Sequence, residues 1–352
     1  MSLRKLFKKL PHPLQQKIRQ YCEKTFFEKN RVEKRPHRLY GDIYAPLYNY
    51  DAPMSAAEPD FYNEDGRRKE IFFLRDIHFA HSSYVRGARF EFDRYNWGLK
   101  THFYSHQAML ETMGRPDRRY GFLNESEAIV PEDYALFRKN PGLEKDFDLI
   151  FTFSAELLDS LPNARHVPFG AGLWVGPAYG DDIREDAWAR KSKNISILSS
   201  DKTMCAQHHL RLELARKCRR EGLADAFGRF DGGQFVEKLS EVLLDYRYSI
   251  ILENDLRPFY FTERLTSCFA TMTVPIYLGA SEIDRFFNPD GIIKISVKDL
   301  DDIEKVLAQC SERDYEERLK AIEDNYRRSR RYVNVYDLMY DDYLAPEAGG
   351  GK

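Results

Sequence analysis

Short apolar runs alternate with helical stretches from residue 70 to about residue 173, and the alternation resumes after residue 192. The first series contains the runs EIFFLRDI, YGFLNES, DLIFTFS and NARHVPFG. In the second series, NISILSSD, YRYSIILEN and VPIYLG have the pattern of strands, and CAQHHLRLELARKCRREG and FTERLTSCFATM that of helices. This order predicts an α/β fold with largely parallel sheets that carry helices on both faces.

The same pattern predicts a chain with two α/β domains, since 352 residues exceed the roughly 250 to 300 at which one core stops growing. We expect an N-terminal domain at 70–175, a linker rich in Gly, Asp and Lys at 176–192, and a C-terminal domain at 193–332. Residues 1–69 form a basic segment and a connector, and 333–352 an aromatic segment and a tail. Two such domains facing each other leave a cleft at the carboxyl ends of their strands, where ligands bind.

The first residues have an amphipathic helical pattern. Leu3, Leu6, Phe7 and Leu10 share one face, and Arg and Lys occupy the other. Residues 1–38 hold twelve Lys or Arg against three Glu, whereas the whole chain has a net charge of −2. Residues 1–26 therefore either lie on an anionic membrane surface as a peripheral contact or dock on their own domain.

Composition excludes several classes of protein. Hydrophobic residues at 43% and charged residues at 31% exclude a collagen, a disordered chain and a helical membrane bundle, and the overall charge argues against a nucleic-acid partner. Five scattered cysteines form no CxxC pair, so neither a zinc ribbon nor a disulfide framework is expected. With no secretory signal pattern, we expect a cytoplasmic protein, associated at most with the inner face of the membrane.

The window 248–279 carries the clearest chemistry. A buried strand ends at Asn254, and a helix is expected to begin after Thr262, whose hydroxyl can cap it. The first turn holds Glu263 and Arg264. Backbone N–H groups at a helix start and an Arg side chain both suit a diphosphate, and Glu263 suits ribose hydroxyls. From spacing alone, a charge-matched helix start without a ligand explains the pattern equally well.

The run ENDLRPFYFTERL, followed by ATMTVPIYLGA and FFNPDGIIKI, resembles the donor-binding signature of the α-1,3-fucosyltransferases of glycosyltransferase family 10. In this family a strand ends in F-E-N, and T-E-K stands at a helix start. Arg264 replaces the Lys of that motif. The charge is kept, but a planar guanidinium is not a point charge, so the donor can differ. The resemblance covers about residues 70–330 and is dense only in the second half.

The resemblance also assigns residues outside that signature. Glu125 in FLNES corresponds to the general base of the family, with Glu127 as the rival, since both point to one side if the segment is extended. Arg211 corresponds to a residue that contacts the donor pyrophosphate. Asn254 and Tyr260 are expected at the donor, and Lys238 is a further candidate contact.

Taken together, the resemblance implies a GT-B fold of two Rossmann-like domains facing across a cleft. It implies an inverting hexosyltransferase that moves L-fucose from GDP-fucose to a hydroxyl, by expectation O3, of a surface glycan such as lipopolysaccharide or capsule. No cofactor is then required besides the donor, and no metal site is expected. The sequence Asp146-Phe147-Asp148 precedes an apolar strand, whereas a metal-binding DxD should follow one. Two alternatives remain: another nucleotide sugar as donor, or an inactive glycan-binding protein of the same fold.

Overall fold

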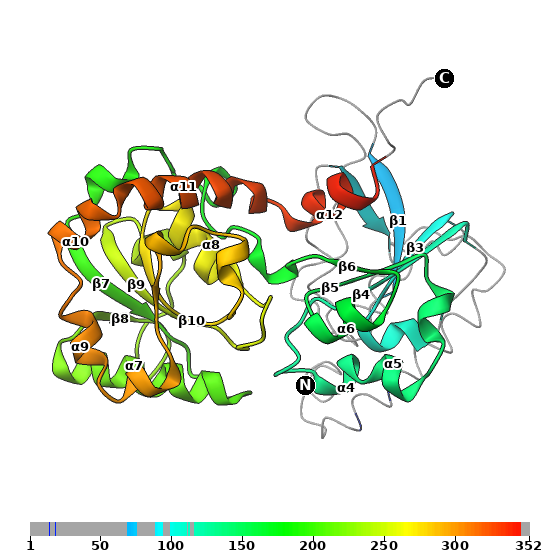
Figure 1. The fold of residues 1–352 in the computed structure, drawn as a ribbon, viewed down its shortest axis with the longest axis horizontal. Coiled ribbons are helices and arrows are strands. Elements are labelled where there is room, and N and C mark those ends of the chain that lie inside the picture. Colours follow the sequence, from blue (N-terminus) through cyan, green and yellow to red (C-terminus); the bar gives the residue numbers. More distant parts are fainter. Residues whose placement is uncertain are drawn as a thin grey trace, which may run out of the picture.

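A computed structural model describes residues 69–75, 89–93, 99–110, 112 and 116–345, together with Leu14 and Ile18. The amphipathic pattern of residues 1–26 and the connector up to residue 68 therefore lie outside the described residues, apart from these two. The described chain forms two parallel α/β units side by side (Figure 1).

The first unit is built on a six-stranded parallel sheet with the order β2-β1-β3-β4-β5-β6. Its strands are β1 (Glu70–Arg75), β2 (Phe90–Asp93), β3 (Thr101–Ser105), β4 (Arg118–Phe122), β5 (Leu149–Thr152) and β6 (Ala164–His166). Its α-helices are α4 (Pro131–Tyr134), α5 (Leu136–Lys139) and α6 (Ala155–Ser160). Aromatic side chains stack over this sheet: the rings of Phe90 in β2 and Phe103 in β3, on either side of β1, are 6.2 Å apart and nearly parallel.

The second unit is built on a five-stranded parallel sheet with the order β11-β10-β9-β7-β8. Its strands are β7 (Lys193–Leu198), β8 (Asp225–Phe227), β9 (Tyr246–Leu252), β10 (Val274–Leu278) and β11 (Ile293–Lys294). Its α-helices are α7 (Ala206–Glu221), α8 (Glu263–Ala270), α9 (Ile303–Leu307), α10 (Glu312–Glu317) and α11 (Leu319–Ser329). The chain moves from β7 outward to β8 and then back to β9 on the other side of β7. The switch point between β7 and β9 is where parallel sheets of this kind bind ligands.

The last helix, α12 (Val335–Tyr343), returns to the first sheet. Figure 1 shows α11 running over the second unit and α12 lying beside β1. Val335, Tyr336 and Met339 are buried in the same cluster as Phe103 and Phe122 of the first unit. The aromatic C-terminal segment thus completes the core of the N-terminal unit, because its apolar face covers one side of that sheet.

The two units meet through loops at the carboxyl ends of their strands. The Phe153 ring, just after β5, lies 5.1 Å from the Tyr260 ring, and the His166 ring at the end of β6 lies 5.6 Å from that of Phe259. Loops that follow β4, β5 and β6 therefore face the loop that follows β9. The predicted α/β fold with two parallel-sheet domains whose carboxyl edges face each other is confirmed.

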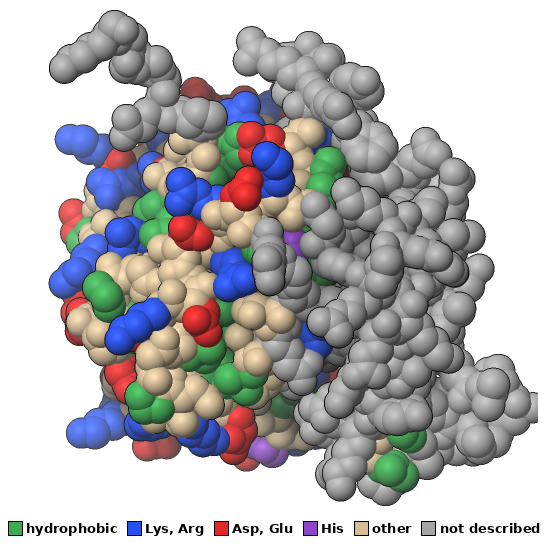
Figure 2. All heavy atoms as spheres, turned by 90° about the vertical axis from the view of Figure 1, so that its right-hand side faces the viewer, with side chains coloured by type: hydrophobic (Ala, Val, Ile, Leu, Met, Phe, Trp, Pro, Cys, Tyr) green, Lys and Arg blue, Asp and Glu red, His purple; other side chains and the backbone are tan. Residues whose placement is uncertain are grey.

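Acidic and basic side chains are interspersed on the described part of the face in Figure 2, and neither sign forms a continuous patch there. No helix among the described residues is both long and apolar enough to cross a membrane. The four cysteines in the described part of the chain, Cys205, Cys218, Cys268 and Cys310, are free thiols.

Candidate active site

Glu253, directly after β9, organises the loop that leads to α8. Its side chain is fully buried, and its carboxylate accepts hydrogen bonds from the Thr262 backbone N–H at 2.9 Å and from the Thr262 hydroxyl at 2.8 Å. Gly279 makes room for it, since a Cβ there would stand 2.7 Å from Glu253 Cγ. Burial, and secondly the charge of the neighbouring Glu263, raise the pKa of Glu253 to about 7. The loop 254–261 is thereby closed at both ends by one buried acid.

Thr262 is the N-cap of α8, as the sequence predicts. Its Oγ1 accepts a hydrogen bond of 3.3 Å from the Arg264 backbone N–H, and its backbone is extended at that point. Glu263 and Arg264 follow in the first turn and are both partly exposed. Loss of hydration raises the pKa of Glu263, and the adjacent Arg264 opposes that shift. The start of α8 thus presents an acid and a cation together at the carboxyl edge of the sheet.

Arg211 of α7 reaches the same edge from the neighbouring βα unit. It is 2% exposed, and its Nη1 donates to the Leu252 carbonyl at 2.7 Å and to Asn254 Oδ1 at 3.2 Å. Its buried Nε has no hydrogen-bond partner among the described residues. Burial, and secondly the charge of Arg264, lower the pKa of Arg211 to about 9. A bound anion would supply the missing acceptor.

His208, one helical turn before Arg211, is a residue that our sequence reasoning did not assign. Its Nδ1 accepts a hydrogen bond of 3.1 Å from the Met204 backbone N–H. Burial first, and then the charges of Arg211 and Arg264, lower the pKa of His208 to about 4. The imidazole is therefore neutral near pH 7 and adds no charge to the cluster. The spacing of three residues in HHLR places His208 and Arg211 on one helix face and was the available signal.

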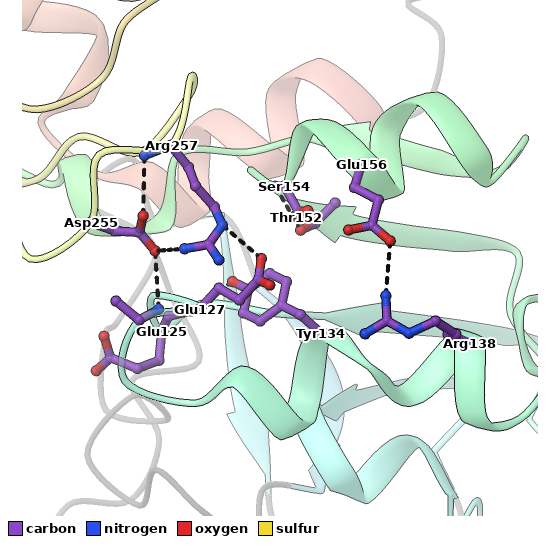
Figure 3. A network of polar contacts seen from close by, with 10 residues as sticks. Glu125, Glu127, Tyr134, Arg138, Thr152, Ser154, Glu156, Asp255 and Arg257 are labelled. Atoms are coloured by element: carbon purple, nitrogen blue, oxygen red, sulfur yellow. Dashed lines mark hydrogen bonds and ion pairs between the residues drawn. The ribbon is translucent and has the colours of Figure 1, made fainter. Parts of the chain in front are cut away.

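Glu125 and Glu127 lie in the loop after β4, on the opposite unit. Ser126 donates its backbone N–H to Glu125 Oε1 at 2.8 Å, and the buried Tyr134 hydroxyl donates to the Glu125 carbonyl at 2.6 Å. The Glu127 carboxylate forms an ion pair of 3.0 Å with Arg257 Nε. Burial raises the pKa of Glu127, and Arg257 lowers it. Figure 3 shows that the two carboxylates point apart.

The expectation that Glu125 and Glu127 point to the same side is therefore wrong. It assumed an extended segment, whereas the chain turns here, with the N–H groups of Ile129 and Val130 both bonded to the Ser126 carbonyl at 3.0 Å. The turn leaves Glu127 paired with Arg257. Glu125 makes no ion pair with any residue in the described ranges.

Tyr260, in the loop 254–261, extends from the C-terminal unit into the core of the N-terminal unit. Tyr260 is 4% exposed and packs in the hydrophobic cluster of the N-terminal unit with Phe153 and Leu157. Burial first, and then the charges of Glu253, Glu125 and Glu263, raise the pKa of the Tyr260 phenol. The acid after β4 and the acids beside α8 thus both act electrostatically on this phenol. Tyr260 packs between the units, and its contact with the donor stays a prediction.

Lys238 lies beside the linker between the two units. Its Nζ donates to the Gly180 carbonyl at 3.4 Å and stands 3.9 Å from Asp181 Oδ1. Its side chain is about half exposed, so its role as a donor contact also stays a prediction. In the linker itself, burial and secondly the charge of Glu263 raise the pKa of the Tyr179 phenol.

The comparisons with known proteins agree with the resemblance in the sequence. Residues 188–336 match the family described as "Glycosyltransferase family 10 (fucosyltransferase) C-term". No curated protein sequence matches this chain.

Several solved structures are similar at low sequence identity. An α1,3-fucosyltransferase with GDP-fucose is 12% identical, with a TM-score of 0.47, and the match covers 86% of this chain and 96% of that one. An α1,3-fucosyltransferase with GDP is 13% identical, also with a TM-score of 0.47, over 80% and 92% of the two chains. Sucrose-phosphate synthase from Thermosynechococcus elongatus is 13% identical, with a TM-score of 0.37, over 71% and 75%.

The match over 188–336 contains α7 with Arg211, the loop after β9 with Asn254 and Thr262, and the start of α8 with Glu263 and Arg264. The predicted donor-side residues therefore lie in the part of the chain that the family match covers. The resemblance is confirmed for this part of the molecule: residues 188–336, most of the C-terminal domain, match the C-terminal part of glycosyltransferase family 10.

Proposed function

We propose that this protein is an inverting fucosyltransferase that moves L-fucose from GDP-fucose to a hydroxyl, by expectation O3, of a surface glycan such as lipopolysaccharide or capsule. The observation that carries the proposal is the buried guanidinium of Arg211, whose Nε lacks a partner among the described residues while Arg264 stands close by. Leaving a buried guanidinium N–H without an acceptor is costly, so this site suits an anionic ligand.

The donor diphosphate fits this place on geometric grounds. Parallel sheets bind ligands outside their carboxyl ends at a topological switch point, which here lies between β7 and β9. The N-terminal turn of α8 adds backbone N–H groups and a positive helix end. Glu263, in the same turn, is placed to accept hydrogen bonds from ribose hydroxyls.

The chemistry needs a base on the side opposite to the leaving group. In the proposed step the Glu125 carboxylate takes the proton from the acceptor hydroxyl. At the same time a new bond forms between the oxygen of that hydroxyl and the anomeric carbon of the donor sugar. The bond from that carbon to the β-phosphate oxygen breaks, and its electron pair leaves with GDP. Arg211, Arg264 and the helix start stabilise the growing charge on GDP. No cofactor besides the donor takes part in this scheme.

Glu125 is favoured over Glu127 as the base because of their partners. The Glu127 carboxylate forms an ion pair of 3.0 Å with Arg257. A general base takes up a proton, and protonating Glu127 would neutralise its charge and weaken this ion pair. The only hydrogen bond given to the Glu125 carboxylate within the described part of the chain comes from the backbone N–H of Ser126. It is therefore available to a substrate hydroxyl.

The acceptor and the cellular setting rest on the sequence alone. Residues 1–38 carry twelve Lys or Arg against three Glu, which suits a peripheral contact with an anionic membrane on the cytoplasmic side. Such a position would bring the enzyme to a lipid-linked glycan. If this is right, removing residues 1–26 weakens co-sedimentation with anionic vesicles and leaves soluble turnover unchanged.

A panel of nucleotide sugars tests the proposal directly. Calorimetry and donor turnover with GDP-fucose, GDP-mannose and UDP-sugars should show GDP-fucose as the preferred donor. Tighter binding of UDP than of GDP would overturn the fucose assignment in favour of another nucleotide sugar. Glycan binding without product from any donor would favour an inactive binding protein of the same fold.

A further inference from the structure

Asp255 and Arg257, in the loop after β9, reach across to the opposite domain (Figure 3). Asp255 Oδ2 accepts a hydrogen bond of 3.0 Å from the Ala128 backbone N–H, and Arg257 Nε lies 3.0 Å from Glu127 Oε2. Both contacts end on the turn that carries Glu125. Asp255 and Arg257 of the donor-side domain therefore hold the loop of the proposed base, and we call these two contacts the grip.

The two residues of the grip are also hydrogen-bonded to each other. Arg257 donates its Nη1 to Asp255 Oδ2 at 2.6 Å and its backbone N–H to Asp255 Oδ1 at 3.1 Å. The Asp255 side chain is 4% exposed, so it is a buried carboxylate whose charge is balanced by Arg257. Removing Arg257 would leave the buried Asp255 carboxylate without its counter-charge, so the two side chains stabilise each other. The chain Ala128–Asp255–Arg257–Glu127 closes a ring across the domain boundary.

The turn is also held from its own domain. The buried Tyr134 hydroxyl donates to the Glu125 carbonyl at 2.6 Å. The main chain of the turn is thus held by Tyr134 on one side and by Asp255 on the other. The Glu125 carboxylate points away from the ion pair of Arg257 with Glu127 (Figure 3). Contacts that fix the backbone at Glu125 and leave its carboxylate available suit a general base, which must stand at a defined distance from its substrate.

We propose that Asp255 and Arg257 are positioning residues that set where Glu125 stands relative to the bound donor. The inference rests on the proposed function, since it takes Glu125 as the base. Asp255 directly follows Asn254, whose amide holds Arg211, so a single peptide unit links the donor cations to the base loop. A displacement of about 1 Å at such a site can cost about a hundredfold in rate.

The test compares Asp255→Ala and Arg257→Ala with the unaltered protein and with a control. Arg138→Ala is the matched control, because it removes an ion pair of 3.2 Å with Glu156 in the same neighbourhood but within one domain (Figure 3). We expect kcat for transfer to fall about tenfold to a hundredfold in both variants, while the GDP dissociation constant stays within about threefold. Arg138→Ala should change neither value.

A double variant separates positioning from general damage. Combined with Glu125→Gln, either change should cost little more than Glu125→Gln alone, because both act through the same carboxylate. Losses that multiply, or a GDP dissociation constant that rises as kcat falls, would overturn the inference. Asp255→Asn keeps an acceptor for Ala128 N–H and should retain more activity than Asp255→Ala; equal losses would contradict the geometry.

Amide hydrogen exchange over residues 123–130 tests the grip independently of activity. Exchange at Ala128 should quicken in Asp255→Ala and stay unchanged in Arg138→Ala. If the unaltered protein transfers no sugar from any donor, the proposed function fails. If exchange at Ala128 is the same in Asp255→Ala as in the unaltered protein, the grip itself is refuted, whatever the activity.

Discussion

Asn254 and Asp255 are neighbours at the end of β9, yet their side chains serve different domains. Asn254 Oδ1 accepts from the Arg211 guanidinium at 3.2 Å, and Asp255 Oδ2 accepts from the Ala128 N–H across the boundary at 3.0 Å. The residues that we assign to the donor and the loop that we assign to the acceptor are thus connected through one peptide bond. Residues 254 and 255, directly after β9, therefore connect the two sides of the candidate site.

Arg264→Ala should weaken the binding of GDP about tenfold, because one charge-assisted contact to phosphate is lost, worth roughly 1.5 kcal/mol. Stability should change little, since the Arg264 side chain is partly exposed and its backbone N–H, which bonds to Thr262, is retained. Calorimetry with GDP and with GMP measures the effect, and the loss should be larger for GDP.

Arg313→Ala is the control for this change, because it removes an exposed cation paired with Glu317 on α10 of the same domain. Arg264→Lys should keep most of the affinity for GDP. An affinity in Arg264→Ala equal to that of the unaltered protein would show that the helix start is only charge-matched and binds no phosphate.

Glu125→Gln should lower kcat for transfer by about a hundredfold or more, the usual contribution of a general base, while GDP binds as before. Glu127→Gln should have a smaller effect, because the Gln amide oxygen can still accept a hydrogen bond from Arg257 and only the charge of this ion pair is lost. Steady-state kinetics of both variants provide the comparison. The reverse order of the two losses would assign the base to Glu127.

Glu253 should make the stability of the protein depend on pH. Burial raises its pKa to about 7, so the folded state binds this proton more tightly than the unfolded state does. The contribution is greatest below the ordinary pKa of a glutamate, about 4.3, and is lost as the pH rises through about 7. Glu253→Gln, which cannot ionise, should show a smaller loss of stability between pH 5 and pH 8 by roughly 2 to 3 kcal/mol.

Urea unfolding of both proteins at several pH values measures this difference. Glu263→Gln is a useful comparison, because Glu263 lies near Glu253 and raises its pKa as a second cause after burial. Removing the Glu263 charge should move the steepest part of the pH dependence to lower pH. Parallel stability curves for the unaltered protein and Glu253→Gln would contradict an ionising Glu253.

Tyr260 distinguishes packing from donor binding. Its ring lies 5.1 Å from Phe153 in the cluster of the N-terminal domain, so Tyr260→Ala should cost about 3 to 5 kcal/mol of stability, as other large buried aromatics do. Tyr260→Phe keeps the ring and should leave GDP affinity within about twofold if the residue only packs. A marked loss of affinity in Tyr260→Phe would instead support the predicted donor contact.

The fold class and the local donor motif follow from the sequence, because both depend on short-range patterns. Alternating strands and helices predict the parallel sheets, and the placement of Thr262 before the apolar face of FTERLTSCFA predicts its cap. The aromatic C-terminal segment is visible in the sequence, but its pattern does not say which domain it covers. That choice depends on which sheet has an unburied face, which only the assembled chain decides.

Long-range relationships required the tertiary structure. The partners of Asp255 and Arg257 are more than a hundred residues away, and no spacing rule connects ENDLR with FLNES. The opposite directions of Glu125 and Glu127 depend on a turn that the alternating pattern does not reveal. The sequence therefore determined which chemical groups are present and on which elements they lie. The packing of one domain edge against the other decided which groups meet, because burial and pairing are properties of the folded whole.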